Sequence, residues 1–389
     1  MSVEVINFGC RLNIAEGEAL RAQLAGEDDL IVINSCAVTR EAERQARQAI
    51  RRAAKRRPDA RIMVTGCAAK TNGGAFSSMP EVEALFEKDK SGPAVSGADH
   101  ARAFIEVQNG CDHRCTFCII PYGRGDSRSV PAGAVIEAVQ KAVERGQQEV
   151  ILTGVDLTSY GADLPGAPTL GSLVERIFRH VPALPRLRLS SLDSVEIDPL
   201  LEELIVGEPR LMPHVHLSLQ HGDDMILKRM KRRHSRAQAV ALVERLKARR
   251  PEIAVGADII AGFPTEDEAT FANSLALLDD CDIVFGHVFP FSPRPGTPAA
   301  RMPQLDRALV RERAAKLRGV AEARKARWLQ SLVGTRQHAL IELDGRSGHA
   351  ANFASVTLEQ RLPASNMRGT MIDIFITGSD GRTLSGRPA

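Results

Sequence analysis

The sequence lacks a long apolar run. Its apolar stretches, such as Ile283–Phe291, are far shorter than the roughly 18 consecutive apolar residues of a membrane-spanning helix. It also has no basic and apolar leader and no low-complexity tract. We therefore expect a cytoplasmic protein with no membrane partner.

The net charge is also small, because 51 Lys and Arg residues stand against 48 Asp and Glu residues. A charge of +3 at pH 7 does not by itself indicate a nucleic-acid partner. The basic residues are nevertheless clustered in three stretches, Arg40–Arg57, Asp224–Arg250 and Arg301–Arg327. Such stripes suit phosphate contacts, but a charge run is more usually a solvated helix face. Both interpretations stay open.

A disulfide framework is not expected either. The seven cysteines are an odd number, and the cytosol keeps thiols reduced. The chain has 389 residues, of which 43% are apolar and 25% are charged, which is enough for two or three globular domains. Metal binding or catalysis is therefore the leading use of the cysteines.

Three early segments share one pattern, in which an apolar run leads into a cysteine and then into a polar or helical stretch. They are Val3–Cys10, Leu30–Cys36 and Arg61–Cys67. With a helix near Glu41–Arg56, this pattern predicts a small parallel α/β domain up to about residue 69, with each cysteine at the carboxyl end of a strand. Residues 71–99 read as a linker with one short helix around Pro80–Phe86.

Strands and amphipathic helices alternate from Arg102 onward, which predicts six βα units and a parallel barrel or partial barrel. The predicted strands are Ala103–Gln108, Glu149–Val155, Arg186–Leu192, His214–Gln220, Val255–Gly262 and Ile283–Phe291. A long basic helix ends near Leu332, and short β-like runs follow it at Gln337–Leu343, Ala354–Leu358 and Met371–Thr377. These runs predict a small appended β-barrel.

A second set of cysteines, Cys111, Cys115 and Cys118, follows the first barrel strand with the spacing C-x-x-x-C-x-x-C. A loop of this kind can wrap three thiolates around one cubane cluster and leave one iron without a protein ligand. An open iron can be chelated by S-adenosylmethionine (SAM), which the cluster then reduces. The alternative is a structural zinc site with His113 as fourth ligand, although zinc modules favour paired C-x-x-C units. Cys281 has no partner at either spacing, and we interpret it as a packing residue.

The segment Gln108–Arg128, QNGCDHRCTFCIIPYGRGDSR, resembles the core of the radical SAM methylthiotransferases. Cys10 within GCRLN, Cys36 within NSC and Cys67 within TGC match the amino-terminal domain of that family, in which three cysteines hold a second cluster. The resemblance covers nearly the whole chain. It implies an auxiliary-cluster domain at residues 1–96, a radical SAM barrel at 97–327 and a TRAM-like β domain at 328–389.

The resemblance also implies the chemistry. Two 4Fe–4S clusters and SAM would be the cofactors, and a reductant such as flavodoxin or ferredoxin would be a partner. A 5′-deoxyadenosyl radical would remove a substrate hydrogen, and sulfur presented at the second cluster would join the resulting carbon radical. Polar groups at the carboxyl ends of the barrel strands are the expected SAM contacts. We expect cofactor contacts from Phe117, Gly154, Ser190, Gln220, Asp258 and Ile260.

The substrate is the open question within this family. Its members act on prenylated adenosine of tRNA, on threonylcarbamoyl-adenosine of tRNA, or on an aspartate of a ribosomal protein. The stretches LTGVDLTSYG, GADIIAGFPTE and HVFPFSPRPGTPAA are most similar to the threonylcarbamoyl-adenosine branch. This implies methylthiolation at C2 of that nucleoside in the anticodon loop of tRNA, with Ser292 and Arg294 as candidate substrate contacts.

Some positions depart from the family pattern. Ser35 stands where Thr is usual, His221 stands where Ser is usual, and the gap from Cys10 to Cys36 is short. Two classes other than an enzyme also stay open, namely a metal- or cluster-stabilised RNA-binding protein and an iron–sulfur sensor or scaffold. Neither would need an open iron or a six-unit barrel.

Overall fold

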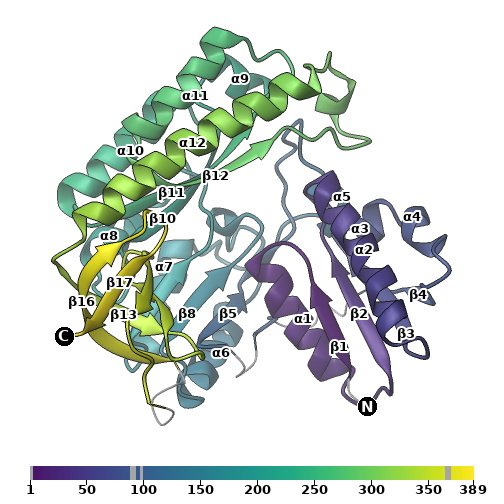
Figure 1. The fold of residues 1–389 in the computed structure, drawn as a ribbon, viewed down its shortest axis with the longest axis horizontal. Coiled ribbons are helices and arrows are strands. Elements are labelled where there is room, and N and C mark those ends of the chain that lie inside the picture. The colour runs from purple at the N-terminus through teal and green to yellow at the C-terminus, as the bar shows by residue number, and fades with distance from the viewer. Residues whose placement is uncertain (1–2, 88–92, 97–99, 364–368) are drawn as a thin grey trace.

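Three parts follow one another along the chain in the computed structural model, which describes residues 3–87, 93–96, 100–363 and 369–389 (Figure 1). A small parallel sheet with helices is followed by a large curved sheet with outer helices, and then by a small β-barrel. Within these ranges no helix has the length and apolar character that crossing a membrane requires. The α/β fold class with an appended β-barrel is thus as the sequence predicts.

The amino-terminal part is a four-stranded parallel sheet in the order β1-β2-β3-β4. Its elements are β1 (Glu4–Asn7), α1 (Arg11–Gln23), β2 (Leu30–Ser35), α2 (Arg40–Arg56), β3 (Arg61–Gly66), α3 (Cys67–Thr71), α4 (Gly74–Ser77) and β4 (Ala84–Leu85). Every residue of β2 is buried because the strand is covered on both faces. Ile31 and Ile33 pack in one core with Ile50 of α2, whereas Leu30 packs in a second core with Leu20 of α1.

The predicted helix around Pro80–Phe86 is wrong. Ala84 and Leu85 instead form β4, which pairs with Met63 and Val64 of β3. Leu85 packs against the core between α2 and the sheet. Pairing with an existing sheet edge therefore outweighs the local preference of a segment too short to form a stable helix.

The central part contains two three-stranded parallel sheets, β5-β8-β9 and β10-β11-β12. Their strands are β5 (Arg102–Glu106), β8 (Glu149–Thr153), β9 (Arg186–Leu189), β10 (His214–Gln220), β11 (Ala254–Ala261) and β12 (Ile283–Pro290). Single bridges from Leu187 to Leu211 and from Leu192 to Leu217 join them. The result is the predicted six-stranded partial barrel.

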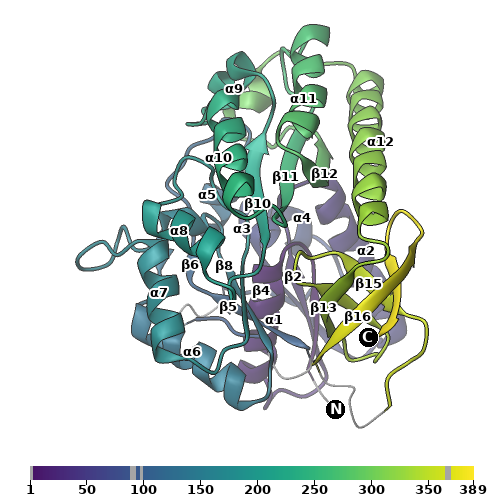
Figure 2. The same cartoon turned by 90° about the vertical axis from the view of Figure 1, so that its left-hand side faces the viewer.

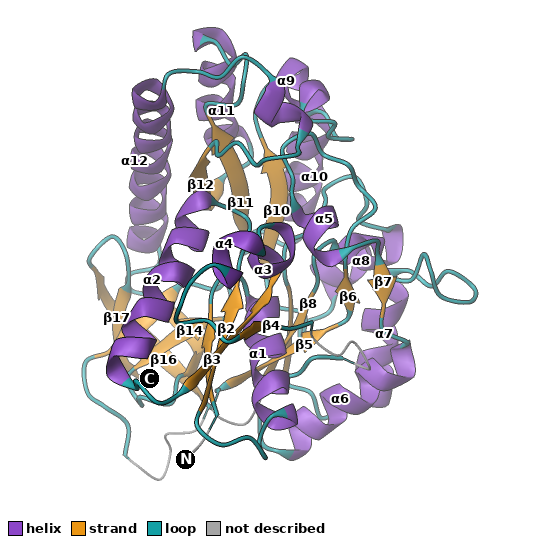
Figure 3. Cartoon of the chain, turned by 90° about the vertical axis from the view of Figure 1, so that its right-hand side faces the viewer, coloured by secondary structure: helices purple, strands orange, loops and turns teal. Residues whose placement is uncertain are grey.

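Helices cover the outside of this barrel, as Figures 2 and 3 show. They are α6 (Ala132–Glu144), α7 (Leu170–His180), α8 (Pro199–Gly207), α9 (Asp224–Arg229), α10 (Arg236–Arg249), α11 (Glu268–Asp280) and α12 (Arg307–Ser331). Shorter elements in the connections are β6 (Gln108–Asn109), α5 (Ile120–Arg124), β7 (Arg128–Ser129) and the 3₁₀ turns Leu157–Ser159 and Pro298–Arg301. One continuous apolar core lies between the strands and the helices, and Cys281 is part of it, as its interpretation as a packing residue requires.

The carboxy-terminal part is a closed five-stranded barrel in the order β13-β14-β15-β17-β16. Its strands are β13 (Arg336–Ile341), β14 (Ser347–Ala350), β15 (Ser355–Leu358), β16 (Thr370–Ser379) and β17 (Leu384–Pro388). The sequence analysis missed β14 and β17, whose glycines, serines and proline weaken a strand signal. Leu329 near the end of α12 lies in the core of this small barrel.

The small barrel covers the floor of the central barrel, where its parallel strands begin. Arg188 of β9 donates hydrogen bonds to the carbonyl oxygens of Ala350 and Ala351, at 2.9 and 2.8 Å. Phe353 lies beneath the strands, with its ring centroid 4.8 Å from that of His214 on β10. The central barrel is therefore closed at this end, and its other end is left for ligands.

The predicted domain boundaries stay predictions. The first one falls beside residues 97–99, which lie outside the described residues. The second one falls within α12.

Candidate active site

Three cysteines meet at the carboxyl edge of the amino-terminal sheet. Cys10 precedes α1, Cys36 follows β2, and Cys67 begins α3. The loop of Gly9 comes so close to Cys36 that a Cβ added to Gly9 would lie 3.0 Å from the Cys36 Sγ atom. Gly9 has a φ of +105°, so glycine is favoured at this close approach.

These thiols suit a metal cluster better than they suit an apolar core. Burial raises the pKa of the Cys36 thiol to about 11, and the neighbouring Cys67 and Cys10 act in the same direction. All three are free thiols rather than disulfides. Metal ions that take the three sulfurs as thiolates would offset the cost of burying negative charge at Cys36. On this chemistry the first triad fits a cluster.

The second triad, Cys111, Cys115 and Cys118, lies in the loop between β6 and α5 at the open end of the barrel. Burial raises the pKa of both Cys111 and Cys118 to about 12. This set of three free thiols on one short loop also fits a cluster.

Thr116 fixes the loop that carries the second triad. Its backbone N–H donates to the carbonyl oxygen of Met230 at 3.0 Å, and its hydroxyl donates to that of Arg229 at 2.8 Å. Its own carbonyl oxygen accepts from the Ala299 N–H at 2.9 Å. The loop is thus tied to the segments that follow β10 and β12, which gives the thiols a defined position.

The two triads face each other across the seam between the sheet and the barrel. Helix α5 packs on α3, and a Cβ added to Gly123 would lie 3.2 Å from the Cys67 Cβ atom. Cys67 is also among the groups that raise the pKa of Cys118, although burial is the largest cause. Arg124 crosses the seam and pairs with Glu16 of α1 at 2.5 Å.

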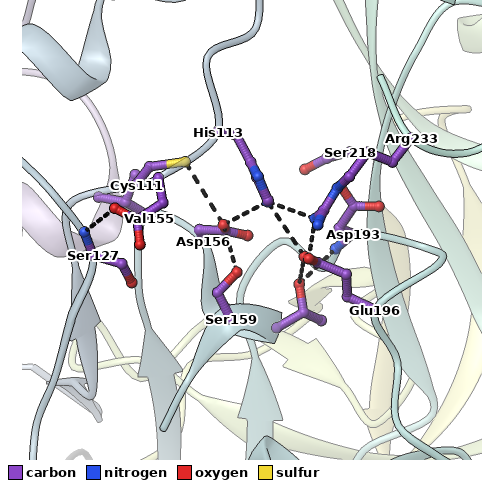
Figure 4. A network of polar contacts seen from close by, with 12 residues as sticks. Cys111, His113, Ser127, Val155, Asp156, Ser159, Asp193, Glu196, Ser218 and Arg233 are labelled. Carbon is purple, nitrogen blue, oxygen red and sulfur yellow. Dashed lines mark hydrogen bonds and ion pairs between the residues drawn. The ribbon is translucent and has the colours of Figure 1, made fainter. Parts of the chain in front are cut away.

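His113 is held by carboxylates beside the second triad (Figure 4). Its Nε2 atom lies 2.9 Å from Asp156 and 3.5 Å from Glu196. Burial alone would raise the pKa of Asp156, but hydrogen bonds from His113 and Ser159 lower it below the usual value. These contacts orient the His113 ring beside the cysteine loop, where the ligand atoms of Cys111, His113 and Asp156 lie within 4.8 Å of one another.

Two of the predicted cofactor contacts come together. Phe117 packs against the small apolar cluster that contains Ile260 of β11. Ser190, just beyond β9, has a buried hydroxyl without a hydrogen-bond partner in the described part of the chain. Such an orphaned group at a strand end is one that a bound cofactor could satisfy.

The remaining predicted contacts have other surroundings. Gly154 lies against Gln108, and a Cβ added to it would be 3.0 Å from the Gln108 Oε1 atom. Gln220 has a φ of +67° at the end of β10, where the pairing with β11 is irregular. Asp258 lies deeper in the barrel and contacts His216 and His287.

The two candidate substrate contacts lie at the seam with α2. The Ser292 hydroxyl accepts a 3.4 Å hydrogen bond from the backbone N–H of Arg40. Arg294 is buried and forms an ion pair with Glu43. The structure therefore places both on the loop that joins β12 to the amino-terminal part, and it engages Arg294 within the protein.

Several residues near the site gave no signal in the sequence analysis. Arg232 lies 3.7 Å from the Cys115 Sγ atom and pairs with Asp193 at 2.8 Å. Arg11, next to Cys10, lies 5.1 Å from the ring centroid of Phe353. His216 could have been found, because it is a polar residue within the predicted strand His214–Gln220.

The fold and the cysteine loop together define a radical SAM enzyme. Residues 105–278 match the Radical SAM superfamily, and residues 2–87 match a family described as Uncharacterized protein family UPF0004. A solved radical S-adenosylmethionine methyltransferase, TsrM from Kitasatospora setae, shares the fold with a TM-score of 0.53 at 14% identity, over 75% of this chain and 77% of that one. As a radical SAM protein, the chain uses SAM and a 4Fe–4S cluster.

Curated relatives identify the family within the radical SAM enzymes to which the chain belongs. A threonylcarbamoyladenosine tRNA methylthiotransferase, MtaB, of Rickettsia prowazekii is 46% identical over 92% of both chains. A tRNA-2-methylthio-N(6)-dimethylallyladenosine synthase of Ruegeria pomeroyi is 31% identical over 87% of both. The chain belongs to the radical SAM tRNA methylthiotransferases, as its motifs predict.

Proposed function

We propose that the chain transfers a methylthio group to C2 of threonylcarbamoyl-adenosine in the anticodon loop of tRNA. The observation that carries this proposal is the pair of cysteine triads that face each other across the α3–α5 contact. A reaction that needs both a radical and a sulfur donor needs two such sites near one substrate atom. The similarity to the Rickettsia prowazekii enzyme supports the choice of nucleoside.

In this proposal each triad has one task. Cys111, Cys115 and Cys118 hold the cluster that binds SAM, and Cys10, Cys36 and Cys67 hold a second 4Fe–4S cluster. When bound, these groups supply the electron that cleaves SAM and the sulfur that is transferred. The protein itself positions the groups, through the hydrogen bonds of Thr116 and the packing of α5 on α3.

SAM would lie along the carboxyl ends of the barrel strands. Phe117 and Ile260 would contact its adenine, and the Ser190 hydroxyl, Gln220, Gly154 and Asp258 would contact its polar parts. The orphaned Ser190 hydroxyl and the clustered apolar pair support this placement. Ser292 and Arg294 stay candidate substrate contacts, on the loop after β12 that contacts α2.

The tRNA would contact the basic stripes and the carboxy-terminal barrel, and an external reductant such as flavodoxin or ferredoxin would supply electrons. Some side chains of the stripes are already paired, since Arg44 contacts Glu41 and Arg249 contacts Glu203. These pairs are typical of a solvated helix face and do not by themselves indicate a phosphate-binding surface. The proposal of a tRNA substrate therefore relies on the family and not on charge alone.

Mass spectrometry of tRNA nucleosides from cells that lack the gene tests the proposal. We expect the methylthio derivative of threonylcarbamoyl-adenosine to disappear and its precursor to accumulate. If the derivative persists in a cell with no other enzyme for it, the substrate assignment is wrong. Loss of the dimethylallyl counterpart, or of a modified ribosomal aspartate, would assign the chain to another branch.

A further inference from the structure

Two histidines share one carboxylate inside the barrel. The Asp258 Oδ1 atom lies 3.1 Å from the His216 Nε2 atom and 3.4 Å from the His287 Nδ1 atom. The residues come from β10, β11 and β12, and the two imidazole centroids are 4.7 Å apart. Gly256, opposite His216 in the sheet, makes room for this arrangement, because a Cβ there would be 2.4 Å from the His216 Nδ1 atom.

The two histidines differ in what they offer to a ligand. The His216 side chain is only 10% exposed, and both of its ring nitrogens face the wall, one toward Asp258 and one toward Gly256. The His287 side chain is 62% exposed, and only its Nδ1 atom is directed at Asp258. His287 therefore presents Nε2 to the open interior, while Asp258 holds the ring in place.

A row of rings connects these histidines with a cation of the amino-terminal part, because the His214 ring centroid lies 6.5 Å from that of His216. Arg11 lies over the ring of Phe353, which also contacts His214. The charges of Arg102, Arg188 and Glu149 all act on the Arg11 guanidinium. A partly buried guanidinium that faces more positive charges than negative ones is costly, and an anionic ligand would offset that cost.

The charged residues around Arg11 are also mainly positive. Arg102, Arg186 and Arg188 surround Glu149 at the start of the strands. Arg102 also pairs with Glu342 of the small barrel. Glu149 and Glu342 thus stand against these three arginines, and Arg11 adds a fourth positive charge beside them, while Asp258 brings the carboxylates to three. The floor favours an anion over an apolar group.

We propose that His287 and Arg11 bind the carboxylate that the threonyl group carries on N6 of the adenosine, and so select this substrate over dimethylallyl-adenosine. The inference rests on the proposed function for the nucleoside and adds the residues that recognise it. A dimethylallyl group would leave both donors without a partner, and an unpaired buried donor costs far more than a pair gains. Towards the substrate carboxylate Asp258 acts as a positioning residue, because it orients His287 without touching that carboxylate.

Binding of two RNAs that differ in one charge tests this inference. One anticodon stem–loop carries threonylcarbamoyl-adenosine, and the other carries its methyl ester, which keeps the shape and removes the carboxylate. We expect the full-length reconstituted protein, held anaerobically, to bind the acid at least about tenfold more tightly than the ester in fluorescence anisotropy. In His287→Phe and in Arg11→Met this ratio should fall to within about twofold, with little change in ester affinity.

Two further variants keep the test decisive. His338→Phe replaces a histidine on the small barrel whose exposed ring pairs with Asp373 and not with Asp258, and it should keep the full ratio. His287→Gln, which retains a hydrogen-bonding side chain, should keep part of the ratio. An unchanged ratio in both His287→Phe and Arg11→Met would overturn the inference, as would a preference that appears only when a divalent metal is added.

Failure of this inference is distinguishable from failure of the proposed function. If the holoenzyme methylthiolates acid and ester equally well, the proposed function stands and recognition by the carboxylate is wrong. If it methylthiolates neither RNA, the proposed function fails. A binding ratio that is lost in His287→Phe would still support the recognition.

Discussion

Arg124 and Glu16 form an ion pair across the seam that separates the two cysteine triads, with 2.5 Å between the Nη1 and Oε1 atoms. Their side chains are 8% and 9% exposed, so the pair is shielded from water. Arg124 also donates to the side-chain oxygens of Asn13 and Asn109, at 2.5 and 2.9 Å. One guanidinium thus connects α1, which follows Cys10, with α5, which follows Cys118.

Replacing Arg124 by Gln should loosen this seam. The variant removes the positive charge that faces the buried Glu16 carboxylate, and breaking a buried pair in this way typically costs about 3 kcal/mol in the free energy of unfolding. We also expect 5′-deoxyadenosine formation to continue while the yield of methylthiolated RNA falls. Only the second product requires the two triads to keep their relative position. Urea unfolding and quantification of both products check this.

A matched control is Lys141→Ala on α6. Its pair with Glu137 is similarly short, at 2.6 Å, but the two side chains are 60% and 65% exposed. Exposed pairs contribute little, so the free energy of unfolding should change by less than about 0.5 kcal/mol. Equal losses in the two variants would contradict a special role for Arg124.

His349 should make the docking of the small barrel sensitive to acid. Burial, followed by the charges of Arg102 and Arg188, lowers the pKa of His349 to about 3. Arg102 lies 2.9 Å from its Nδ1 atom, and donation to that atom requires the neutral ring. The unfolded chain takes up a proton near its ordinary pKa of about 6.5, and the folded chain does not.

The sign follows from proton counting. Below pH of about 6.5 the unfolded state binds the extra proton, so stability falls as pH decreases, until the folded ring is protonated as well. His349 can change the free energy of unfolding by at most about 1.4 kcal/mol per pH unit. His349→Gln keeps an acceptor for Arg102. Between pH 6 and pH 4, the decrease in the free energy of unfolding should be smaller in this variant than in the wild type. Identical slopes in thermal unfolding would refute the assignment.

His221, which departs from the family pattern, should be a structural residue. Its Nε2 atom donates to Glu266 at 3.0 Å, and its Nδ1 atom accepts from the Asp223 N–H at 3.0 Å. Glu266 in turn accepts from the Gly262 N–H at 3.0 Å and pairs with Arg313 at 2.8 Å. This buried chain of contacts positions the loop after β11.

His221→Leu should therefore lower the free energy of unfolding by about 2 kcal/mol, since it leaves buried polar groups without a partner. Because the Gly262 loop borders the proposed SAM site, SAM binding measured by calorimetry should weaken too. His180→Leu at the exposed end of α7 is the control, and it should change neither quantity. A stable His221→Leu protein with normal SAM binding would contradict this role.

Local patterns were enough to predict much of the fold. The apolar runs ending in Cys36 and Cys67 predicted β2 and β3, and alternating strands and helices predicted the barrel. Strand β17 was missed because its sequence, LSGRP, has too few apolar residues for a periodic signal. The helix predicted near Phe86 failed because an edge of β3 was available for pairing.

The contacts of the site were less accessible to sequence reasoning because they join distant residues. The contact of Arg11 with Phe353 and the pairing of Arg294 with Glu43 each join two different parts of the chain, which must be assembled first. No spacing rule connects such residues. The cysteines were easier to find because local patterns indicate them. The first triad follows three apolar runs, and the second has the spacing C-x-x-x-C-x-x-C.

The central claim is that one triad serves SAM cleavage and the other serves sulfur transfer. Product analysis of two variants tests this claim most directly. Each reconstituted protein is incubated with SAM, a reductant and RNA that carries threonylcarbamoyl-adenosine, and 5′-deoxyadenosine and methylthiolated nucleoside are quantified by mass spectrometry. We predict that Cys115→Ala forms neither product, whereas Cys36→Ala forms 5′-deoxyadenosine without methylthiolated nucleoside. Methylthiolated nucleoside from Cys36→Ala would contradict the account.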